Sequence, residues 1–140
     1  MNSRIHIRII QDETTMDQAL QIRQEVFVEE QQVDPEIEYD EFEESSTHIL
    51  ATIEDTPAGT ARWRQTDEGY KLERFAVPEK FRGQGVGAAL LVFILDQLDD
   101  RSKVYLNSQL VAMGFYEKMG FTAVGDIFYE ADIPHKKMVL

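Results

Sequence analysis

Apolar residues recur along this chain with two periods, every second residue in some segments and every third or fourth in others. The first period predicts β-strands and the second predicts amphipathic helices. The segments predicted as strands are 5–10, 48–54, 60–65, 70–77, 104–107, 121–124 and 137–140. The segments predicted as helices are 16–29, 84–98 and 109–119. A further short helix is predicted within the acidic segment that ends at residue 46.

Turn residues between these segments indicate how the strands connect. The turns at 55–59 and 67–69 join three consecutive strands into an antiparallel meander. Pro78 ends the last of these strands, and a helix follows. The order of elements indicates an α/β (α+β) fold in one domain over residues 1–140. We expect a mixed, mostly antiparallel sheet of about six to seven strands, flanked by about four helices.

The first predicted helix carries a start signal and a buried stripe. We expect Thr14 or Thr15 to cap it. The residues expected to face the core are Ala19, Ile22 and Val26. In the acidic segment that follows, Asp34 and Pro35 are expected to interrupt the chain between a short helix and loops.

The composition is that of an ordinary globular domain. The chain has 140 residues, 43% of them hydrophobic, which is enough to build a full core. No apolar stretch approaches the roughly 18 residues of a membrane span. The chain has no cysteine, so disulfides, thiolate zinc sites and cysteine nucleophiles are excluded. These properties favour a cytoplasmic location.

The chain is strongly acidic, with a formal net charge of −12. This charge argues against general binding to nucleic acid or to an anionic membrane, because both require a basic surface. Acidic residues are concentrated between Glu25 and Glu44. That segment is either a solvated face that keeps the protein in solution or a field that attracts a cationic substrate such as an amine.

A glycine-rich turn at residues 82–87, Arg-Gly-Gln-Gly-Val-Gly, precedes the long apolar run 88–95. Glycines allow a close approach of the backbone to a ligand. A helix that starts here directs its unpaired N–H groups and its dipole into the turn, which suits phosphate or pyrophosphate. The basic residues that could assist are Arg74, Lys80, Arg82 and Lys118. The turn therefore suggests a phosphorylated cofactor.

A dinucleotide-binding turn, a P-loop and a turn without a ligand fit this stretch less well. Gly83, Gly85 and Ala88 match a loose dinucleotide-binding fingerprint. The preceding strand belongs to a hairpin, however, and Asn107 stands where a ribose-binding acid is expected. A P-loop is excluded because no Gly-Lys-Ser/Thr follows. A turn that binds nothing is disfavoured because so many glycines lower the stability of the folded chain.

The turn resembles the Arg/Gln-x-x-Gly-x-Gly/Ala signature of GNAT-type N-acetyltransferases. Residues 72–78 lie where that family has its bulged fourth strand, and the aromatic-rich segment 114–121 resembles its second motif. Segments 22–31 and 133–138 resemble the ElaA/YjcF-like branch of small bacterial GNATs. The resemblance implies a single-domain GNAT acyl-CoA N-acyltransferase fold and acetyl-CoA as the co-substrate.

The resemblance also implies how the cofactor is held. The pyrophosphate would lie on backbone amides of the turn, contributed by Arg82, Gly83, Gln84, Gly85, Val86, Gly87 and Ala88. Arg82 could add a charged contact or be an ordinary surface arginine. The pantetheine arm would lie along Phe75, Ala76 and Val77, with Asn107 and Lys118 as further contacts. Asn107 is equally compatible with a simple turn role.

For the chemistry, the Val77 amide is the expected oxyanion donor and Tyr116 the expected general acid. Tyr116 could instead be an aromatic that only packs against the sheet. The base stays open among several residues, with Glu73 as the first choice through a shared strand face with Phe75. The other candidates are His48, His135, Glu25 and Glu29, and water without a dedicated base is a further possibility.

The leading function is therefore transfer of an acetyl group from acetyl-CoA to a primary amine by direct attack. A non-catalytic acyl-CoA-binding sensor on the same fold is the alternative. The acceptor could be a small, cationic amine or a basic peptide. Either a monomer or a homodimer is compatible with the sequence.

Overall fold

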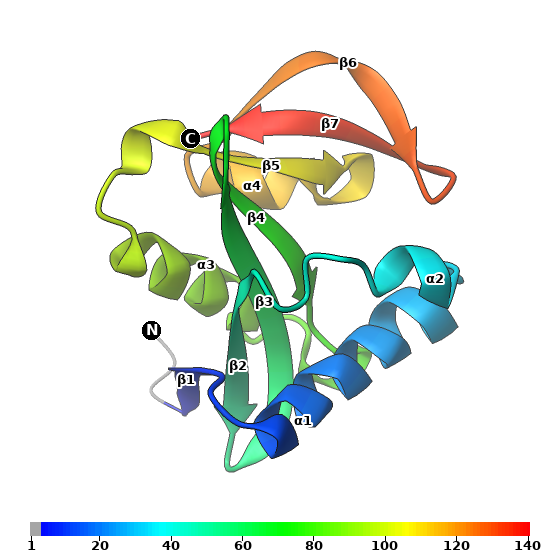
Figure 1. Cartoon of the computed structure of the whole chain (residues 1–140), viewed down its shortest axis with the longest axis vertical. Helices are drawn as coiled ribbons and strands as arrows, with labels where there is room; N and C mark the ends of the chain where they lie inside the picture. The colour runs from blue at the N-terminus through cyan, green and yellow to red at the C-terminus, as the bar shows by residue number, and fades with distance from the viewer. Residues whose placement is uncertain (1–3) are drawn as a thin grey trace.

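Seven strands form one sheet in the order β1-β2-β3-β4-β5-β7-β6 (Figure 1). The computed structural model describes residues 4–140. The strands are β1 (Ile5–Ile9), β2 (Thr47–Ile53), β3 (Thr56–Thr66), β4 (Gly69–Ala76), β5 (Val104–Gln109), β6 (Thr122–Glu130) and β7 (Ile133–Val139). The β4–β5 pair is parallel and the other neighbouring pairs are antiparallel. The predicted mixed, mostly antiparallel sheet is confirmed.

Helices cover both faces of this sheet. They are α1 (Glu13–Arg23), continued by the π-helix η1 (Gln24–Glu30), α2 (Pro35–Glu38), α3 (Val86–Gln97) and α4 (Met113–Lys118). Three short 3₁₀ turns are η2 (Glu79–Phe81), η3 (Arg101–Lys103) and η4 (Leu110–Ala112). α1 and α2 lie together on one side of the strands (Figure 1). Over residues 4–140 no helix is both long enough and apolar enough to cross a membrane.

Two apolar layers hold the helices to the sheet. Successive residues of β2 alternate between the layers, so that Ile49 and Ala51 pack with α3 and α4 while Leu50 packs with α1. The predicted stripe of Ala19, Ile22 and Val26 is buried in the α1 layer, as expected.

The predicted caps of the first helix are wrong. Asp12 is the N-cap, and its Oδ1 accepts a hydrogen bond from the Thr15 amide at 2.7 Å. Thr15 is buried, and its Oγ1 accepts a bond from Arg8 Nη2 at 2.7 Å. The short helix predicted for the acidic segment is α2, and the Asp34-Pro35 pair begins it after the interruption that follows η1. The Asp34 carboxylate caps that helix and Pro35 occupies its first turn, where a missing N–H does no harm.

Several element ends also differ from the predictions. α3 begins at Val86, not at residue 84, because Gly83 and Gly85 have the positive φ values 79° and 85° that a right-handed helix does not allow. β5 continues to Gln109, so the helix predicted from that residue begins only at Met113, after η4. β6 and β7 are longer than predicted because they pair with each other as a hairpin.

One close contact fixes α3 on β3. A Cβ built on Gly59 would lie 2.6 Å from Val86 Cγ1 and 3.2 Å from Leu90 Cδ1. We expect Gly59→Ala to destabilise the fold by about 1–3 kcal/mol through overpacking. Gly114→Ala is the matched control, since nothing lies within 4 Å of its Cβ and the exchange favours a helix. Urea midpoints measure both, and an unchanged midpoint for Gly59→Ala would show that α3 is free to move.

Candidate active site

β4 and β5 are paired along only part of their length. Their register runs from Tyr70↔Val104 to Leu72↔Leu106. Beyond that point β4 continues beside β3, while β5 turns away beside β7, and the two groups of strands run at a steep angle to each other (Figure 1). The backbone edges of both strands are therefore parted toward their carboxyl ends.

A β-bulge in β4 lies at this opening. Pairing with β3 advances from Glu73 to Ala76 while β3 moves only from Arg62 to Thr60, and Arg74 has φ 60°. The extra residue breaks the alternation of side chains. Leu72 and Phe75 pack in the α3/α4 layer, whereas Glu73 and Arg74 reach charged partners on the α1/α2 side. The prediction that Glu73 shares a face with Phe75 is therefore wrong.

A cleft of about 250 Å³ occupies the gap between the parted strands. Phe75 and Tyr116 border it together with Leu106 from the centre of the sheet. Its other walls come from η1 and α2 and from the β6–β7 hairpin. The polar side chains that line it are Gln31, Glu38, Lys71, Glu73, Arg74, Asn107, Ser108, Gln109, Glu130 and His135. The cleft is thus lined by both apolar and polar side chains.

Tyr116 on α4 is buried and borders the cleft. Its ring makes edge-on contacts with Phe75, Phe115 and Phe121 at centroid distances of 5.9, 4.9 and 5.9 Å. Burial raises the pKa of its hydroxyl above the ordinary value. Tyr116 therefore packs against aromatic neighbours and also borders the cleft, and its predicted role as general acid stays a prediction.

The glycine turn has the backbone of an anion site. Gly83 and Gly85 adopt left-handed conformations, and nothing lies within 4 Å of a Cβ at either position. Gly85 is the N-cap of α3 and supplies no side-chain cap. The first helical bond runs from the Ala89 amide to the Gly85 carbonyl at 3.0 Å, so the preceding amides of the first turn have no acceptor within the helix.

Arg82 ties this turn to the two neighbouring elements. Its Nη1 and Nη2 donate to the Glu30 carboxylate at 2.8 and 2.7 Å, and its Nε donates to the Val77 carbonyl at 2.9 Å. The Arg82 bond holds the pKa of Glu30 below its usual value. Arg82 thus fixes the chain just after β4, and its predicted phosphate contact stays a prediction.

The remaining predicted contacts are divided between the cleft and the outer surface. Asn107 lies within β5, not at its end, and its Nδ2 donates to Glu130 Oε1 at 3.3 Å inside the cleft. Lys118 is exposed on α4 and is not among the residues that line the cleft. Gln84 is only half-buried, and its side chain donates to the Lys80 carbonyl at 3.3 Å.

The environment of Glu73 opposes its predicted role as base. It lies within 3.3 Å of basic groups on Arg62, Arg64 and Lys71. Burial raises the pKa of Glu73, but these positive charges outweigh it and hold the pKa below the usual value. A carboxylate stabilised in this way has little tendency to take a proton near neutral pH.

The other base candidates differ in position. His48 is buried, its Nε2 donates to the Glu43 carbonyl at 2.7 Å, and it does not line the cleft. Glu25 and Glu29 are exposed and lie outside the lining as well. His135 does line the cleft.

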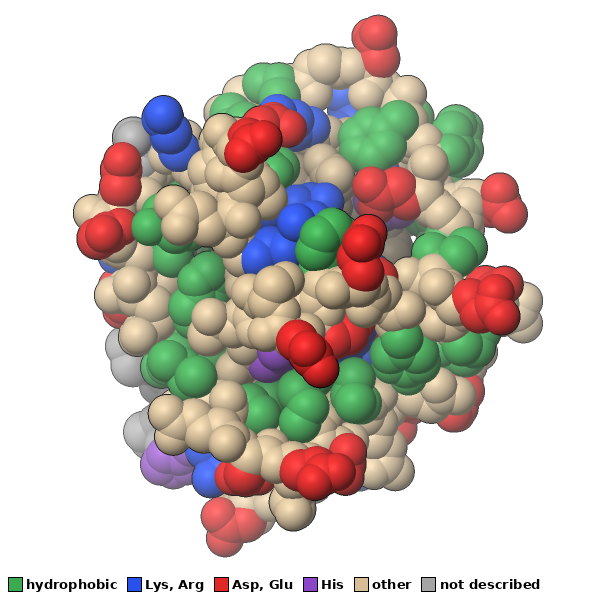
Figure 2. All heavy atoms as spheres, in the orientation of Figure 1, with side chains coloured by type: hydrophobic (Ala, Val, Ile, Leu, Met, Phe, Trp, Pro, Cys, Tyr) green, Lys and Arg blue, Asp and Glu red, His purple; other side chains and the backbone are tan. Residues whose placement is uncertain are grey.

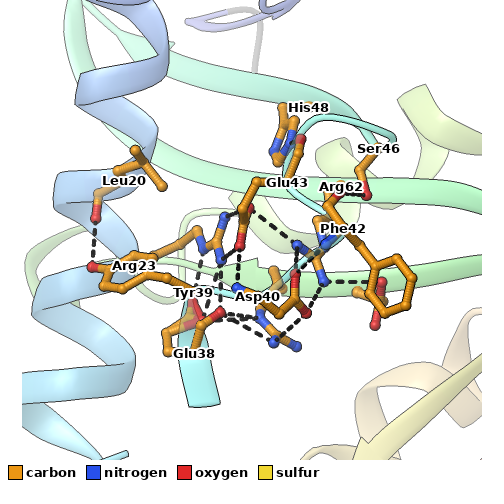
Figure 3. A network of polar contacts seen from close by, with 12 residues as sticks. Leu20, Arg23, Glu38, Tyr39, Asp40, Phe42, Glu43, Ser46, His48 and Arg62 are labelled. Atoms are coloured by element: carbon orange, nitrogen blue, oxygen red, sulfur yellow. Dashed lines mark hydrogen bonds and ion pairs between the residues drawn. The ribbon is translucent and has the colours of Figure 1, made fainter. Parts of the chain in front are cut away.

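A buried ionic network beside the cleft was not anticipated from the sequence (Figure 3). Arg23 Nε donates to Glu38 at 2.7 Å, and Arg23 Nη1 donates to Glu43 at 2.7 Å. Arg62 Nη2 donates to Asp40 at 2.7 Å. Arg74 from the bulge reaches Glu38 at 2.9 Å. The network joins α1, α2 and the segment after it to β3 and β4.

This network changes the interpretation of the acidic segment. Glu38, Asp40 and Glu43 neither form a purely solvated face nor act as a free field, because arginines pair with each of them. Carboxylates are scattered over the outer surface, while basic side chains gather near the middle of one face, over β3 and β4 (Figure 2). The sequence did contain one sign of this network. Arg62 and Arg64 are two charged residues in a strand that is otherwise expected to be largely buried.

The cleft lies between the parted strands β4 and β5, and the glycine turn, which contributes no residue to the cleft lining, follows β4 after η2. The chain belongs to the GNAT acetyltransferases: the family model "Acetyltransferase (GNAT) domain" matches residues 11–140. It is therefore an acyltransferase, and GNAT acetyltransferases use acetyl-CoA.

Similar proteins agree with this membership. The chain is 37% identical over 134 residues to "Uncharacterized N-acetyltransferase YjcF" of Bacillus subtilis, covering 94% of this chain and 96% of the relative. The crystal structure of Escherichia coli ElaA superposes with a TM-score of 0.84 at 29% identity, covering 96% of this chain and 97% of ElaA. An acyl-CoA N-acyltransferase from Pseudomonas aeruginosa gives a TM-score of 0.80 at 27% identity, covering 96% of each chain. The resemblance to the ElaA/YjcF-like branch is confirmed.

The network predicts acid-sensitive stability. Burial raises the pKa of Asp40, but the bond and charge of Arg62 outweigh it and leave that pKa far below the usual value of about 3.9. The pKa of Glu43 is lowered in the same way through Arg23. A lowered carboxyl pKa stabilises the fold above the unfolded-state pKa, and this stability is lost as pH falls. We expect the urea midpoint to fall steeply below about pH 4.

Asp40→Asn removes one of these carboxylates and should flatten that acid-dependent fall, while lowering the midpoint at pH 7 because Arg62 loses a partner. Asp67→Asn, at an exposed aspartate, is the matched control and should follow the wild type. Identical profiles for Asp40→Asn and the wild type would contradict the assignment of acid sensitivity to the network.

Proposed function

We propose that this acetyltransferase transfers the acetyl group of acetyl-CoA to a primary amine by direct attack on the thioester. The observation that carries the proposal is the position of the glycine turn. It follows β4 after the single 3₁₀ turn η2, and Arg82 of the turn is bonded to the Val77 carbonyl just after β4, so an anion site there would lie near the end of the strand that borders the gap. A long cofactor could place its pyrophosphate on the glycine turn and its thioester in the gap between β4 and β5.

The glycine turn would bind the pyrophosphate. The unpaired amides at the start of α3 would donate to its oxygens, and the helix dipole would favour the negative charge. Left-handed Gly83 and Gly85 support this role, because the space around their α-carbons is open. Side chains contribute less, so the acidic surface elsewhere does not oppose binding.

The pantetheine arm would lie along the free edge of β4 at Phe75, Ala76 and Val77. That edge has left β5, so its backbone groups are available to pair with the amides of the arm. Asn107 faces the same cleft from β5 and could add a side-chain contact. The Val77 amide would then donate to the oxyanion that forms on the thioester carbonyl.

Tyr116 would protonate the departing thiolate. Its raised pKa keeps the phenol protonated throughout the physiological range. The same burial destabilises a thiolate formed beside it and increases the affinity of that thiolate for a proton. An apolar environment therefore supports proton transfer from Tyr116 to sulfur at the moment when the C–S bond breaks.

The first test concerns the cofactor. Gly87→Glu places a carboxylate in the first turn of α3, where the dipole stabilises it but where it repels a pyrophosphate. We expect unchanged or higher thermal stability and at least a tenfold loss of coenzyme A affinity by calorimetry. Gln97→Glu adds the same charge about 15 Å along the helix and should leave binding unchanged. Equal affinity in both variants would place the pyrophosphate elsewhere.

The second test concerns the acid. Tyr116→Phe keeps the ring contacts with Phe75, Phe115 and Phe121 but removes the proton. We expect kcat to fall by about 100-fold while coenzyme A affinity stays within twofold. Wild-type turnover in the variant would mean that Tyr116 only packs.

The function itself is tested by coenzyme A release from acetyl-CoA in the presence of a panel of primary amines and basic peptides. We expect acceptor-dependent release that Gly87→Glu abolishes. Binding of acetyl-CoA without release by any acceptor would indicate a sensor of acyl-CoA in place of an enzyme.

A further inference from the structure

His135 stands in the cleft with one ring nitrogen free to accept a proton. Its Nδ1 lies 2.7 Å from the Ile133 carbonyl, and since a carbonyl only accepts, Nδ1 carries the hydrogen. In the neutral ring Nε2 is then the unprotonated atom. The ring stacks on Phe128 at a centroid distance of 5.9 Å, which fixes its plane. The residue is only 8% exposed and lines the cleft.

His135 and Tyr116 approach the cleft from opposite faces of the sheet. Met138, three residues further along β7, packs in the α3/α4 layer, so alternation directs His135 to the α1/α2 side. Tyr116 comes from α4 on the other side. Nucleophile and leaving group occupy different directions around a tetrahedral carbon, so a base and an acid for this reaction belong on different sides.

Glu130 lies beside the free nitrogen of His135. Its Oε2 is 4.0 Å from His135 Nε2, and its Oε1 accepts a bond from Asn107. In the described part of the chain, Glu38 and Glu73 are the other carboxylates that line the cleft, and arginines hold both. Glu130 has neutral partners and is half-exposed, so its charge is available to a cation that enters the cleft.

Among the described residues, the basic side chains that line the cleft with His135 are already paired. Lys71 and Arg74 of β4 line the same cleft and are engaged with Glu73 and with Glu38, respectively. On β7, Lys137 forms an ion pair with Glu68. The residues that β5 presents on this side, Asn107 and Gln109, are neutral, and Gln109 bonds to Gln31 at 2.8 Å. Glu130 is therefore the carboxylate best placed to act on His135 and on an acceptor.

We infer that Glu130 binds the ammonium group of the acceptor and that His135 Nε2 removes a proton from it to generate the nucleophilic amine. This inference rests on the proposed acetyl transfer. The ammonium gives one proton to Nε2, and its nitrogen lone pair then forms the C–N bond to the thioester carbonyl. The C–S bond breaks with its electron pair on sulfur, and the thiolate takes the proton of Tyr116.

The remaining protons balance through water. The amide nitrogen loses its second proton to water, Tyr116 regains a proton from water, and the imidazolium releases its own. One proton is set free for each acetyl group transferred, together with the thiol form of coenzyme A.

The test compares His135→Gln and Glu130→Gln with the wild type in coenzyme A release from acetyl-CoA and a panel of primary amines between pH 6 and pH 9. For His135→Gln we expect about a 100-fold fall in kcat/KM for alkyl amines and loss of the rising limb of the pH profile. A hydrazide, which is neutral across this range, should be affected less than tenfold. Glu130→Gln should mainly raise KM for alkyl amines.

His6→Gln and Asp132→Asn are the controls, since each removes the same kind of group at an exposed position outside the lining of the cleft. Calorimetry should give unchanged coenzyme A affinity for all four variants. If His135→Gln kept wild-type turnover and the rising limb of the pH profile of kcat/KM, this inference alone would be overturned, and water would be the proton acceptor. Absence of turnover in the wild type would overturn the proposed function and this inference together.

A second measurement is independent of turnover. Imidazole ¹⁵N NMR of the wild type, with His135 assigned through His135→Gln, should show the neutral ring protonated at Nδ1. A neutral ring protonated at Nε2 would overturn the assignment of His135 as the base.

Discussion

One extra residue in β4 determines how this site is built. The bulge at Arg74 sends Phe75 toward Tyr116 and leaves Glu73 and Arg74 together on the opposite face. It occurs where β4 stops pairing with β5, so the strand edge is free and the side chains on each side of the gap differ in kind. A regular strand would place alternate residues on each face and would put Arg74 in the apolar layer beside Leu72. The different side chains that β4 presents on the two sides of the gap follow from that shift.

The same shift adds Arg74 to the ionic network. Arg23 and Arg62 are almost completely buried, and a buried charge is tolerated only with a partner. Glu38, Asp40 and Glu43 supply those partners, so the acidic segment is bound over the sheet and α2 becomes a wall of the cleft. A segment of high negative charge would otherwise favour an extended, solvated chain. The arginines thereby turn a repulsive stretch of sequence into a fixed structural element.

The sequence predicted those features that depend on local rules. The glycines of the turn and the aromatic residue at 116 stand in motifs that are contiguous along the chain, and the antiparallel meander of β2, β3 and β4 followed from turn chemistry. The prediction that Thr15 caps α1 was wrong because its hydroxyl accepts a hydrogen bond from Arg8, a residue of another element. The prediction that Glu73 and Phe75 share a strand face was wrong because a bulge cannot be recognised in a pattern of alternating residues. The ionic network could not be predicted because the fold brings together residues that are distant in the sequence. Arg23 and Glu43, for example, are separated by 20 positions.

The network also determines how selective the cleft is for charge. A net charge of −12 suggests a cleft that attracts any cation and repels an anionic cofactor. Arginines neutralise Glu38 and Glu73 inside the cleft, however, and Glu30 near the turn is neutralised by Arg82. Surface carboxylates farther away are screened over about 8 Å at physiological salt. In the proposed reaction, an ammonium group would be attracted to Glu130, the carboxylate beside His135 that no arginine holds among the described residues lining the cleft. In the proposed complex the pyrophosphate would meet backbone amides at the start of α3, and the nearby Glu30 carboxylate is already paired with Arg82.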